Sequence, residues 1–357
     1  MPMSERAASL AEVLDEMTAE GAAELTEHLP DKALRCYACG HRCLINEGKR
    51  GICKVRYNEG GRLLVPAGYV AALACDPTEK KPFFHALPGS DTLTFGMLGC
   101  DLHCGYCQNW LTSQALRDNA AGTAPNIVSA DRLVAMAKAC GASLVGTSYN
   151  EPLITAEWAV DVFRRAKPEG FRTAFISNGN ATPQVLDYIR PWTDCYKIDL
   201  KSMSDRNYRQ LGGVVDNILE TVRMVHERGF WEEIVTLVIP GFNDSEGELR
   251  RAADFIAHVS PDIPWHVTAF HQDYKMTENA NTTAAQLIRA CEIGREAGLR
   301  YVYAGNLPGK VGRWENTYCH ACDELLVERY GYLIRQMKVT PAGQCPKCTT
   351  AIPGIWA

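Results

Sequence analysis

Short apolar runs alternate with longer amphipathic stretches over the central part of the chain. The apolar runs predict strands at Thr92–Met97, Ser143–Tyr149, Arg172–Ser177, Cys195–Leu200, Ile234–Ile239, His266–Phe270 and Tyr301–Ala304. Helical periodicity falls between them, near residues 130–140, 155–167, 183–190, 204–229, 245–258 and 282–297. This alternation favours a parallel sheet, either doubly wound or closed into a full or partial barrel, with chemistry at the C-terminal ends of the strands.

The flanking segments have different patterns. Residues 5–27 place Leu10, Val13, Leu14, Met17 and Leu25 at helical spacing among acidic residues, which predicts an amphipathic helix. Within residues 35–75, two short apolar runs flank a Gly-bearing turn at residues 58–61 and predict a hairpin. We therefore divide the chain into an N-terminal helical segment (1–34), a Cys-rich module (35–90), a barrel (91–314) and a Cys-rich C-terminal module (315–357).

Composition narrows the class of protein. The 357 residues are 46% hydrophobic and 22% charged, with a net charge of -5, so neither a disordered chain nor a polybasic nucleic-acid binder is indicated. No apolar run approaches the roughly 18–20 residues that cross a bilayer. Eight acidic residues and one base, Arg6, precede Lys32, which is unlike a secretory or transit signal. We expect a cytoplasmic protein without a membrane partner.

Cysteine placement supplies the candidate chemistry. Eleven of the 15 cysteines fall in three tight groups: Cys36, Cys39, Cys43 and Cys53; Cys100, Cys104 and Cys107; and Cys319, Cys322, Cys345 and Cys348. Because cytoplasmic thiols stay reduced, such spacing favours metal or cluster ligation over disulfides. The isolated Cys75, Cys140, Cys195 and Cys291 are predicted to be small buried residues.

The central triplet directly follows the first predicted barrel strand. Three thiolates on one loop can bind three irons of a [4Fe-4S] cluster and leave the fourth iron open, whereas structural zinc sites close with four ligands. His103 is a candidate fourth ligand. Cys-x3-Cys-x2-Cys with Tyr106 before the last cysteine resembles the signature of the radical S-adenosylmethionine (SAM) superfamily. That resemblance implies reductive cleavage of SAM to a 5′-deoxyadenosyl radical, within a partial (β/α)6 barrel; a seventh strand at Tyr301–Ala304 is left open.

Later strand ends resemble the pyruvate formate-lyase activating branch of that superfamily. Asn150 and Glu151, Ser177 and Asn178, and Asp199 and Lys201 end the second, third and fourth strands. The resemblance implies that they hold SAM, together with Tyr106, Gln108, Ile239 and His271; His271 is also a candidate at the reaction centre. Several motif positions differ from the activases: the two glycines before Glu151 are absent, and Ile176 replaces an Asp, which leaves a monovalent-cation site undecided.

The two outer cysteine groups each offer four thiolates. Cys319-x2-Cys322 and Cys345-x2-Cys348 have the paired spacing of a zinc ribbon or a rubredoxin-like iron site, and zinc is favoured there. Cys36, Cys39, Cys43 and Cys53 suit zinc or an auxiliary [4Fe-4S] cluster, with His41 as a substitute ligand and a slight preference for zinc.

A narrower resemblance runs from about residue 35 to the C-terminus. Glu79-Lys80-Lys81-Pro82, the triplet, Gly305-Asn306 and the final Ile352–Trp356 segment resemble the radical SAM proteins of the AmmeMemoRadiSam system. This resemblance implies AMMECR-like or Memo-like partners, and the superfamily implies a low-potential donor such as flavodoxin or ferredoxin.

Two hypotheses follow. In the first, the chain is a radical SAM enzyme that removes hydrogen from a protein glycine, as an activase does, or from a small molecule, a peptide or a nucleic acid; the lack of a basic run weakens the last choice. In the second, it is a non-catalytic iron–sulfur carrier or a zinc-stabilised adaptor.

Overall fold

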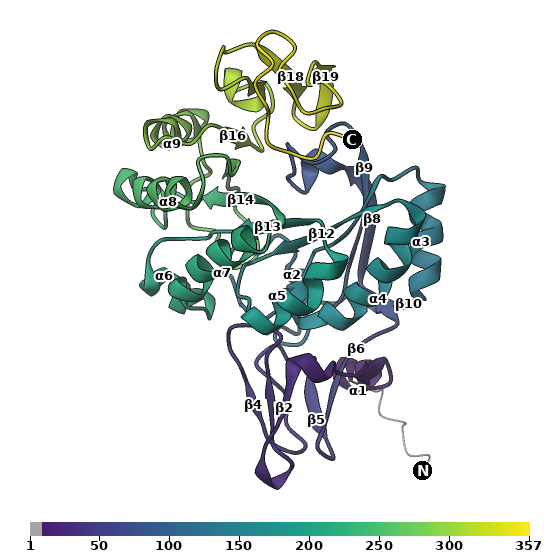
Figure 1. Ribbon diagram of the computed structural model, residues 1–357. Helices are drawn as coiled ribbons and strands as arrows, with labels where there is room; N and C mark the ends of the chain where they lie inside the picture. Colours follow the sequence, from purple (N-terminus) through teal and green to yellow (C-terminus); the bar gives the residue numbers. More distant parts are fainter. Residues whose placement is uncertain (1–8) are drawn as a thin grey trace.

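The computed structural model describes residues 9–357, and its centre is an eight-stranded sheet (Figure 1). Seven strands are parallel and follow one another in chain order: β9 (Asp91–Gly96), β11 (Leu144–Thr147), β12 (Arg172–Ser177), β13 (Cys195–Asp199), β14 (Trp231–Val238), β15 (Trp265–Ala269) and β16 (Val302–Gly305). An antiparallel strand, β8 (Ala72–Pro77), extends the sheet beyond β9. Because β8 and β16 do not pair, the barrel is partial. The predicted fold class is confirmed, and the seventh parallel strand is present.

The outer helices connect successive parallel strands. They are α3 (Ala130–Ala139), α4 (Ala156–Ala166), α5 (Pro183–Ile189), α6 (Asp205–Leu211), α7 (Val215–Glu227), α8 (Glu246–Val259) and α9 (Ala284–Glu296), and a short α2 (Trp110–Ser113) lies after the triplet loop. Hydroxyl side chains accept a hydrogen bond from the first turn at the starts of α3, α5, α6, α8 and α9. These caps explain where the helices begin, since a helix leaves its first N–H groups without partners. The main core lies between these helices and the sheet.

Small sheets form the two Cys-rich ends, which lie on opposite sides of the barrel in Figure 1. The N-terminal part contains β1 (Thr18–Glu20), β6 (Arg62–Pro66) and β5 (Tyr57–Glu59) in one sheet, and β2 (Thr26–His28), β3 (Leu34–Cys36) and β4 (Leu44–Ile45) in another. The strands β7 (Tyr69–Val70) and β10 (Asn126–Ile127) pair beside it. The C-terminal part contains β17 (Thr317–Tyr318), β18 (Leu325–Tyr330) and β19 (Leu333–Met337).

The prediction of one long N-terminal helix is wrong. Residues 1–8 lie outside the described range, and α1 covers only Leu10–Asp15. Thr18–Glu20 pairs instead with β6, so its backbone groups find partners across a sheet. Leu25 is fully buried in a single 3₁₀ turn, which shows that its helical spacing from Leu14 was coincidental.

The prediction of burial fails for two isolated cysteines. Cys75 on β8 and Cys140 at the end of α3 are both exposed, because the edge strand and the helix terminus each face outward. They form a disulfide whose Cα atoms are 6.7 Å apart. Cys195 and Cys291 are fully buried, as predicted.

Candidate functional site

The three central cysteines lie on the loop that leaves β9, and all three line one cavity of about 420 Å³. Gly99 before the loop has a φ of +90°, and a Cβ there would lie 2.8 Å from Val55 Cγ1. The backbone N–H of His103 donates to Leu211 O at 2.9 Å, so the end of α6 also holds the loop. His103 itself is exposed and is not among the residues that line the cavity, which does not favour it as a fourth ligand.

The three sulfur atoms are spaced more widely than the ligands of a single ion would be. Cys100, Cys104 and Cys107 do not form a group whose Sγ atoms are all within 4.8 Å of one another. A single zinc ion, bonded to each sulfur at about 2.3 Å, would draw its ligand atoms to within about 4 Å. Burial raises the pKa of the Cys104 thiol to about 12, so in the absence of iron this sulfur keeps its proton at neutral pH.

A buried carboxylate braces the loop from within. Asp101 is fully buried and accepts hydrogen bonds from Asn178 Nδ2 at 2.7 Å and Asn180 Nδ2 at 2.8 Å. Burial opposes its ionisation, but His41 and the two amides outweigh this and lower the pKa of Asp101. Thus Asn178, which was predicted to hold SAM, also fixes the cluster loop.

Glu151 has a similar bracing role. Its carboxylate is buried and accepts hydrogen bonds from Ser177 Oγ at 2.7 Å, from the backbone N–H of Asn178 at 2.7 Å and from that of Leu153 at 3.0 Å. Burial, followed by the charge of Asp101, raises the pKa of Glu151 to about 8. Asn150 Oδ1 accepts from the backbone N–H of Met97 at 3.1 Å, so both residues tie β11 to its neighbouring strands.

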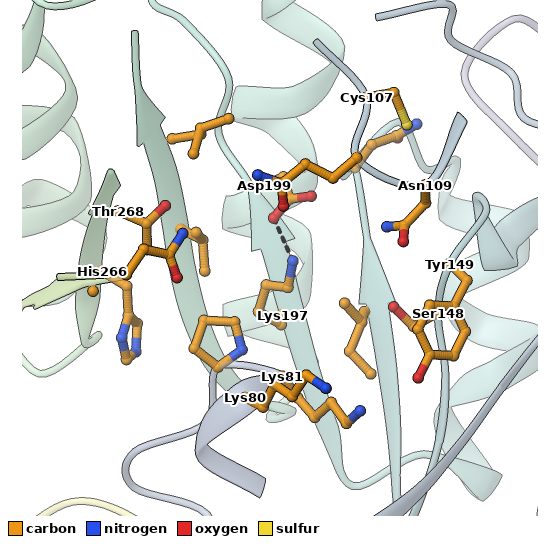
Figure 2. A pocket seen from close by; sticks show the side chains of 18 of the residues that line it. Lys80, Lys81, Cys107, Asn109, Ser148, Tyr149, Lys197, Asp199, His266 and Thr268 are labelled. Carbon is orange, nitrogen blue, oxygen red and sulfur yellow. Dashed lines mark hydrogen bonds and ion pairs between the residues drawn. The ribbon is translucent and has the colours of Figure 1, made fainter. Parts of the chain in front are cut away.

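Lysines share a carboxylate in the middle of the cavity (Figure 2). Asp199 pairs with Lys197 and, at 3.3 Å, with Lys201 Nζ. Burial alone would lower the pKa of Lys201, but the charge of Asp199 and its other neighbours raise it well above its ordinary value. Two ammonium groups against one carboxylate leave an excess positive charge.

A second pair of lysines stands at the other end of the cavity from Cys107 and Asn109 (Figure 2). Asp76 accepts from Lys80 Nζ at 3.1 Å and from Lys81 Nζ at 3.0 Å, again leaving one positive charge in excess. Lys81 is buried, and its Nζ lies 5.7 Å from the centre of the Tyr149 ring.

The cavity brings together ten of the thirteen central residues predicted from the sequence: Cys100, Cys104, Cys107, Tyr106, Gln108, Asn150, Glu151, Asn178, Asp199 and Lys201. Ser177 lies behind Glu151, Ile239 packs in an apolar cluster with Cys104 and Tyr106, and His271 is exposed. His271 still reaches this region, because its Nε2 accepts from Gln108 Nε2 at 2.9 Å. Whether these residues contact SAM stays a prediction.

Sequence reasoning missed Lys197, His266 and Thr268 in the cavity wall. A signal for Lys197 was present, because strand side chains alternate and Lys197 precedes Asp199 by two residues. Lys80 and Lys81 were noticed only as part of a resemblance.

The four C-terminal cysteines converge closely. All four sulfur atoms lie within 4.8 Å of one another, with Cys319 Sγ 3.6 Å from Cys348 Sγ and Cys322 Sγ 3.7 Å from Cys345 Sγ. These separations suit four thiolates around one tetrahedral ion.

Comparison with known proteins identifies the family. Residues 95–256 match the radical SAM superfamily. The uncharacterized protein MJ0808 of Methanocaldococcus jannaschii is 34% identical over 306 residues, covering 85% of this chain and 90% of that protein. The chain belongs to the radical SAM superfamily. It is therefore a radical SAM enzyme rather than the non-catalytic carrier or adaptor of the second hypothesis.

More distant relatives of this radical SAM enzyme are activases. Pyruvate formate-lyase 1-activating enzyme of Escherichia coli K12 is 27% identical, covering 54% of this chain and 80% of that protein. The isethionate sulfite-lyase activating enzyme of Oleidesulfovibrio alaskensis is 27% identical, covering 49% of this chain and 59% of that protein. A solved domain of pyruvate-formate lyase-activating enzyme from Bacteroides vulgatus has a TM-score of 0.41 at 23% identity, covering 45% of this chain and 98% of that one, which is too distant to support a functional conclusion.

Membership in the superfamily implies a [4Fe-4S] cluster and SAM. Across residues 9–357, no helix is both long and apolar enough to cross a bilayer.

Proposed function

We propose that this enzyme cleaves SAM reductively in the cavity beside Cys100, Cys104 and Cys107 and uses the resulting radical on a small substrate. The observation that supports this is a single cavity lined both by the three cysteines and by polar side chains from successive strand ends. A [4Fe-4S] cluster with SAM bound supplies a 5′-deoxyadenosyl radical that removes a hydrogen atom from a substrate.

The side chains around the cavity have distinct proposed tasks. Cys100, Cys104 and Cys107 ligate three irons, and the excess positive charge around Asp199 favours Lys201 as the partner of the SAM carboxylate. Asn150 and Glu151 remain candidates for the SAM ammonium group. Tyr106 lines the cavity and packs with Ile239 and Cys104 in one apolar cluster, which supports the cysteine loop.

The size of the cavity, together with the lysine pair at one end of it, favours a small acidic substrate over a protein loop. Its volume of about 420 Å³ lies toward the low end of ligand pockets, and both a cluster and SAM must share it. Lys80 and Lys81 outnumber the carboxylate they share, so an anionic group on the substrate would be neutralised there. Glu315, Gly331 and Tyr332 of the C-terminal part complete the wall.

A protein substrate is the second candidate, and similarity to two activating enzymes favours it. Addition of cell-extract fractions to the reduced enzyme separates the two. Stimulation of 5′-deoxyadenosine formation by the low-molecular-mass fraction supports the first candidate, whereas stimulation by the macromolecular fraction alone supports the second.

The cleavage itself is tested anaerobically with reconstituted enzyme, SAM and dithionite. We expect 5′-deoxyadenosine from the wild type and from a Cys291→Ala control, and none from a variant with Cys100, Cys104 and Cys107 replaced by Ala. Persistence of the product in that triple variant would overturn the proposal.

The proposal also covers the outer metal site, the electron donor, the partners and the location. Zinc at Cys319, Cys322, Cys345 and Cys348 is supported by their close sulfur spacing. A low-potential donor such as flavodoxin or ferredoxin is supported by superfamily membership. AMMECR-like or Memo-like partners rest on the AmmeMemoRadiSam resemblance alone, and a cytoplasmic location and the four domain boundaries stay predictions from the sequence.

A further inference from the structure

The four N-terminal cysteines do not line the cavity, so its chemistry does not explain them. Cys36 ends β3, Cys39 and Cys43 lie in the turn before β4, and Cys53 lies before β5. Cys36, Cys39 and Cys53 are buried and Cys43 is half-buried. The charge of Cys36 raises the pKa of each of the other three thiols, so Cys36 lies near all three of them.

The separation of these sulfur atoms argues against a single ion. No three of the four have their Sγ atoms mutually within 4.8 Å, in contrast to the four C-terminal cysteines. A single tetrahedral ion holds sulfurs about 4 Å apart. In a cubane cluster each sulfur binds a different iron, so the sulfurs stand about 6 Å apart. The N-terminal group therefore lacks the close spacing of the C-terminal cysteines, as do Cys100, Cys104 and Cys107.

The surroundings of the sulfurs suit thiolate ligands. Arg56 is 1% exposed, and its Nε donates to Cys36 Sγ at 3.2 Å. Both Nη atoms are held by Glu157 at 2.7 Å, so Nε is the donor left for the sulfur. The backbone N–H of Ile52 donates to Cys43 Sγ at 3.4 Å. Hydrogen bonds of this kind stabilise the charge on cluster-bound sulfur.

A competing single-ion site is present but already satisfied. Cys39, His41 and Asp101 place one ligand atom each within 4.8 Å of the others. Asp101 accepts hydrogen bonds from the side-chain amides of Asn178 and Asn180. His41 Nδ1 lies 3.0 Å from Asn180 Nδ2, and His41 Nε2 lies 2.8 Å from Gly212 O. The polar atoms of this triad have partners without an ion, so the triad is better explained as a hydrogen-bonded link between the N-terminal module and the Cys100 loop.

We propose that Cys36, Cys39, Cys43 and Cys53 bind a second iron–sulfur cluster of the cubane type, separate from the one that the central loop holds. Through Cys39, His41 and Asp101, this second site adjoins the loop that carries Cys100. The assignment does not depend on whether the enzyme cleaves SAM.

The test uses the full chain with Cys100, Cys104 and Cys107 replaced by Ala, because this variant keeps all the proposed N-terminal ligands. After anaerobic reconstitution with ⁵⁷Fe and sulfide, we expect about four irons and four acid-labile sulfides per chain, with the Mössbauer spectrum of a cubane. The wild type should hold about twice as much. A triple variant that holds zinc at both outer groups and no acid-labile sulfide would overturn the proposal.

A second variant assigns the ligands. Cys36→Ser together with Cys53→Ser, in the otherwise intact chain, should halve iron and sulfide, whereas Cys195→Ser should leave both at wild-type levels. Unchanged iron and sulfide in the folded double variant would contradict the ligand assignment; if that variant does not fold, the triple variant still decides the question.

Discussion

At the scale of single residues, the cavity repeats one arrangement: two lysines share one carboxylate. Asp199 sits between Lys197 and Lys201, and Asp76 sits between Lys80 and Lys81. Sharing keeps the lysines ordered yet leaves a net positive charge in each place. A ligand with a carboxylate near each position would complete both groups.

Replacement of Lys201 by Gln should weaken SAM binding. Because the variant removes the excess charge beside Asp199, we expect an affinity loss of about tenfold, corresponding to about 1.4 kcal/mol. Iron and sulfide content should stay at the wild-type level. Equilibrium dialysis with SAM measures the change, and the exposed Lys310→Gln serves as the control. Equal affinities in the two variants would remove Lys201 from the binding site.

Replacement of Gly99 by Ala should disturb the cluster loop more than its backbone strain explains. Gly99 and Gly170 both have a φ near +90°, but a Cβ at Gly170 meets nothing within 4 Å whereas one at Gly99 meets Val55 at 2.8 Å. Gly170→Ala should cost about 1 kcal/mol of unfolding free energy, and Gly99→Ala should cost more and also lose iron from the loop. Urea unfolding and iron analysis of both variants check this. Equal costs with full iron would contradict the contact.

Prediction from the sequence worked for residues whose position follows from strand ends. Asp199 and Lys201 line the same cavity as the cysteine loop, because parallel strands end at one edge, and their contact with SAM stays a prediction. Lys81 was not given a role, because it comes from an irregular segment whose path depends on distant contacts. Ser177 and Ile239 were also predicted from strand ends, but neither lines the cavity, because a position near a strand end does not decide which way the side chain faces.

At the scale of elements, the segment 78–90 that crosses from β8 to β9 is fixed by buried polar contacts. Glu233 on β14 accepts from the backbone N–H groups of Phe84 and His85, each at 2.9 Å, and from His266 Nε2 at 2.6 Å. The start of β14 was predicted three residues late, because the consecutive Glu232 and Glu233 are typical of a solvent-exposed segment. Tertiary burial of charge is not visible in local periodicity.

His85 gives this segment a pH dependence. It is fully buried between Pro353 O at 2.7 Å and Tyr303 Oη at 2.6 Å, and burial lowers its pKa to about 4. Below pH 6.5 His85 is protonated in the unfolded chain but stays neutral in the folded chain. The contribution of His85 to the free energy of unfolding is therefore complete above that pH and is lost as pH falls toward 4. We expect His85→Gln to reduce the loss of Tm between pH 6.5 and 4 relative to wild type. A parallel decline in both proteins would contradict this account.

The strands and helices of the barrel were largely predictable because each carries its own period of apolar residues. The N-terminal strands and β8 were not, because segments of two to six residues gain their stability from partners distant in the chain. The break between α6 and α7 likewise escaped prediction, although Gly212 with a φ of +86° ends α6 there.

At the scale of the whole molecule, the C-terminal module closes the side of the cavity that the partial barrel leaves open. Arg329 Nη2 donates to Phe84 O at 2.9 Å, and Tyr303 of β16 packs in the same apolar cluster as Cys319 and Cys345. Loosening of this module should therefore affect the barrel as well.

Replacement of Cys319 and Cys345 by Ser should release one metal ion per chain and lower Tm by several degrees, because four thiolates around an ion stabilise a small module. Elemental analysis and calorimetry measure both effects. Cys291→Ala, at a buried position without close thiol neighbours, is the control. Unchanged metal content and Tm would show that the close sulfurs hold no ion.

The contact of the chain's last residues with the segment 78–90 has a consequence for synthesis on the ribosome. Ala86 pairs with Ile355, and His85 with Pro353, across about 270 residues of sequence. Because chains are synthesised from the N-terminus at about 5–20 residues per second, Pro353 and Ile355 are made tens of seconds after residues 78–90. Throughout that interval the barrel is incomplete, because β16 (Val302–Gly305) and the residues after it have not yet been made, so Cys100, Cys104 and Cys107 are open to iron and sulfide. Cluster insertion during translation, before the final residues dock, is thus the order that the topology favours.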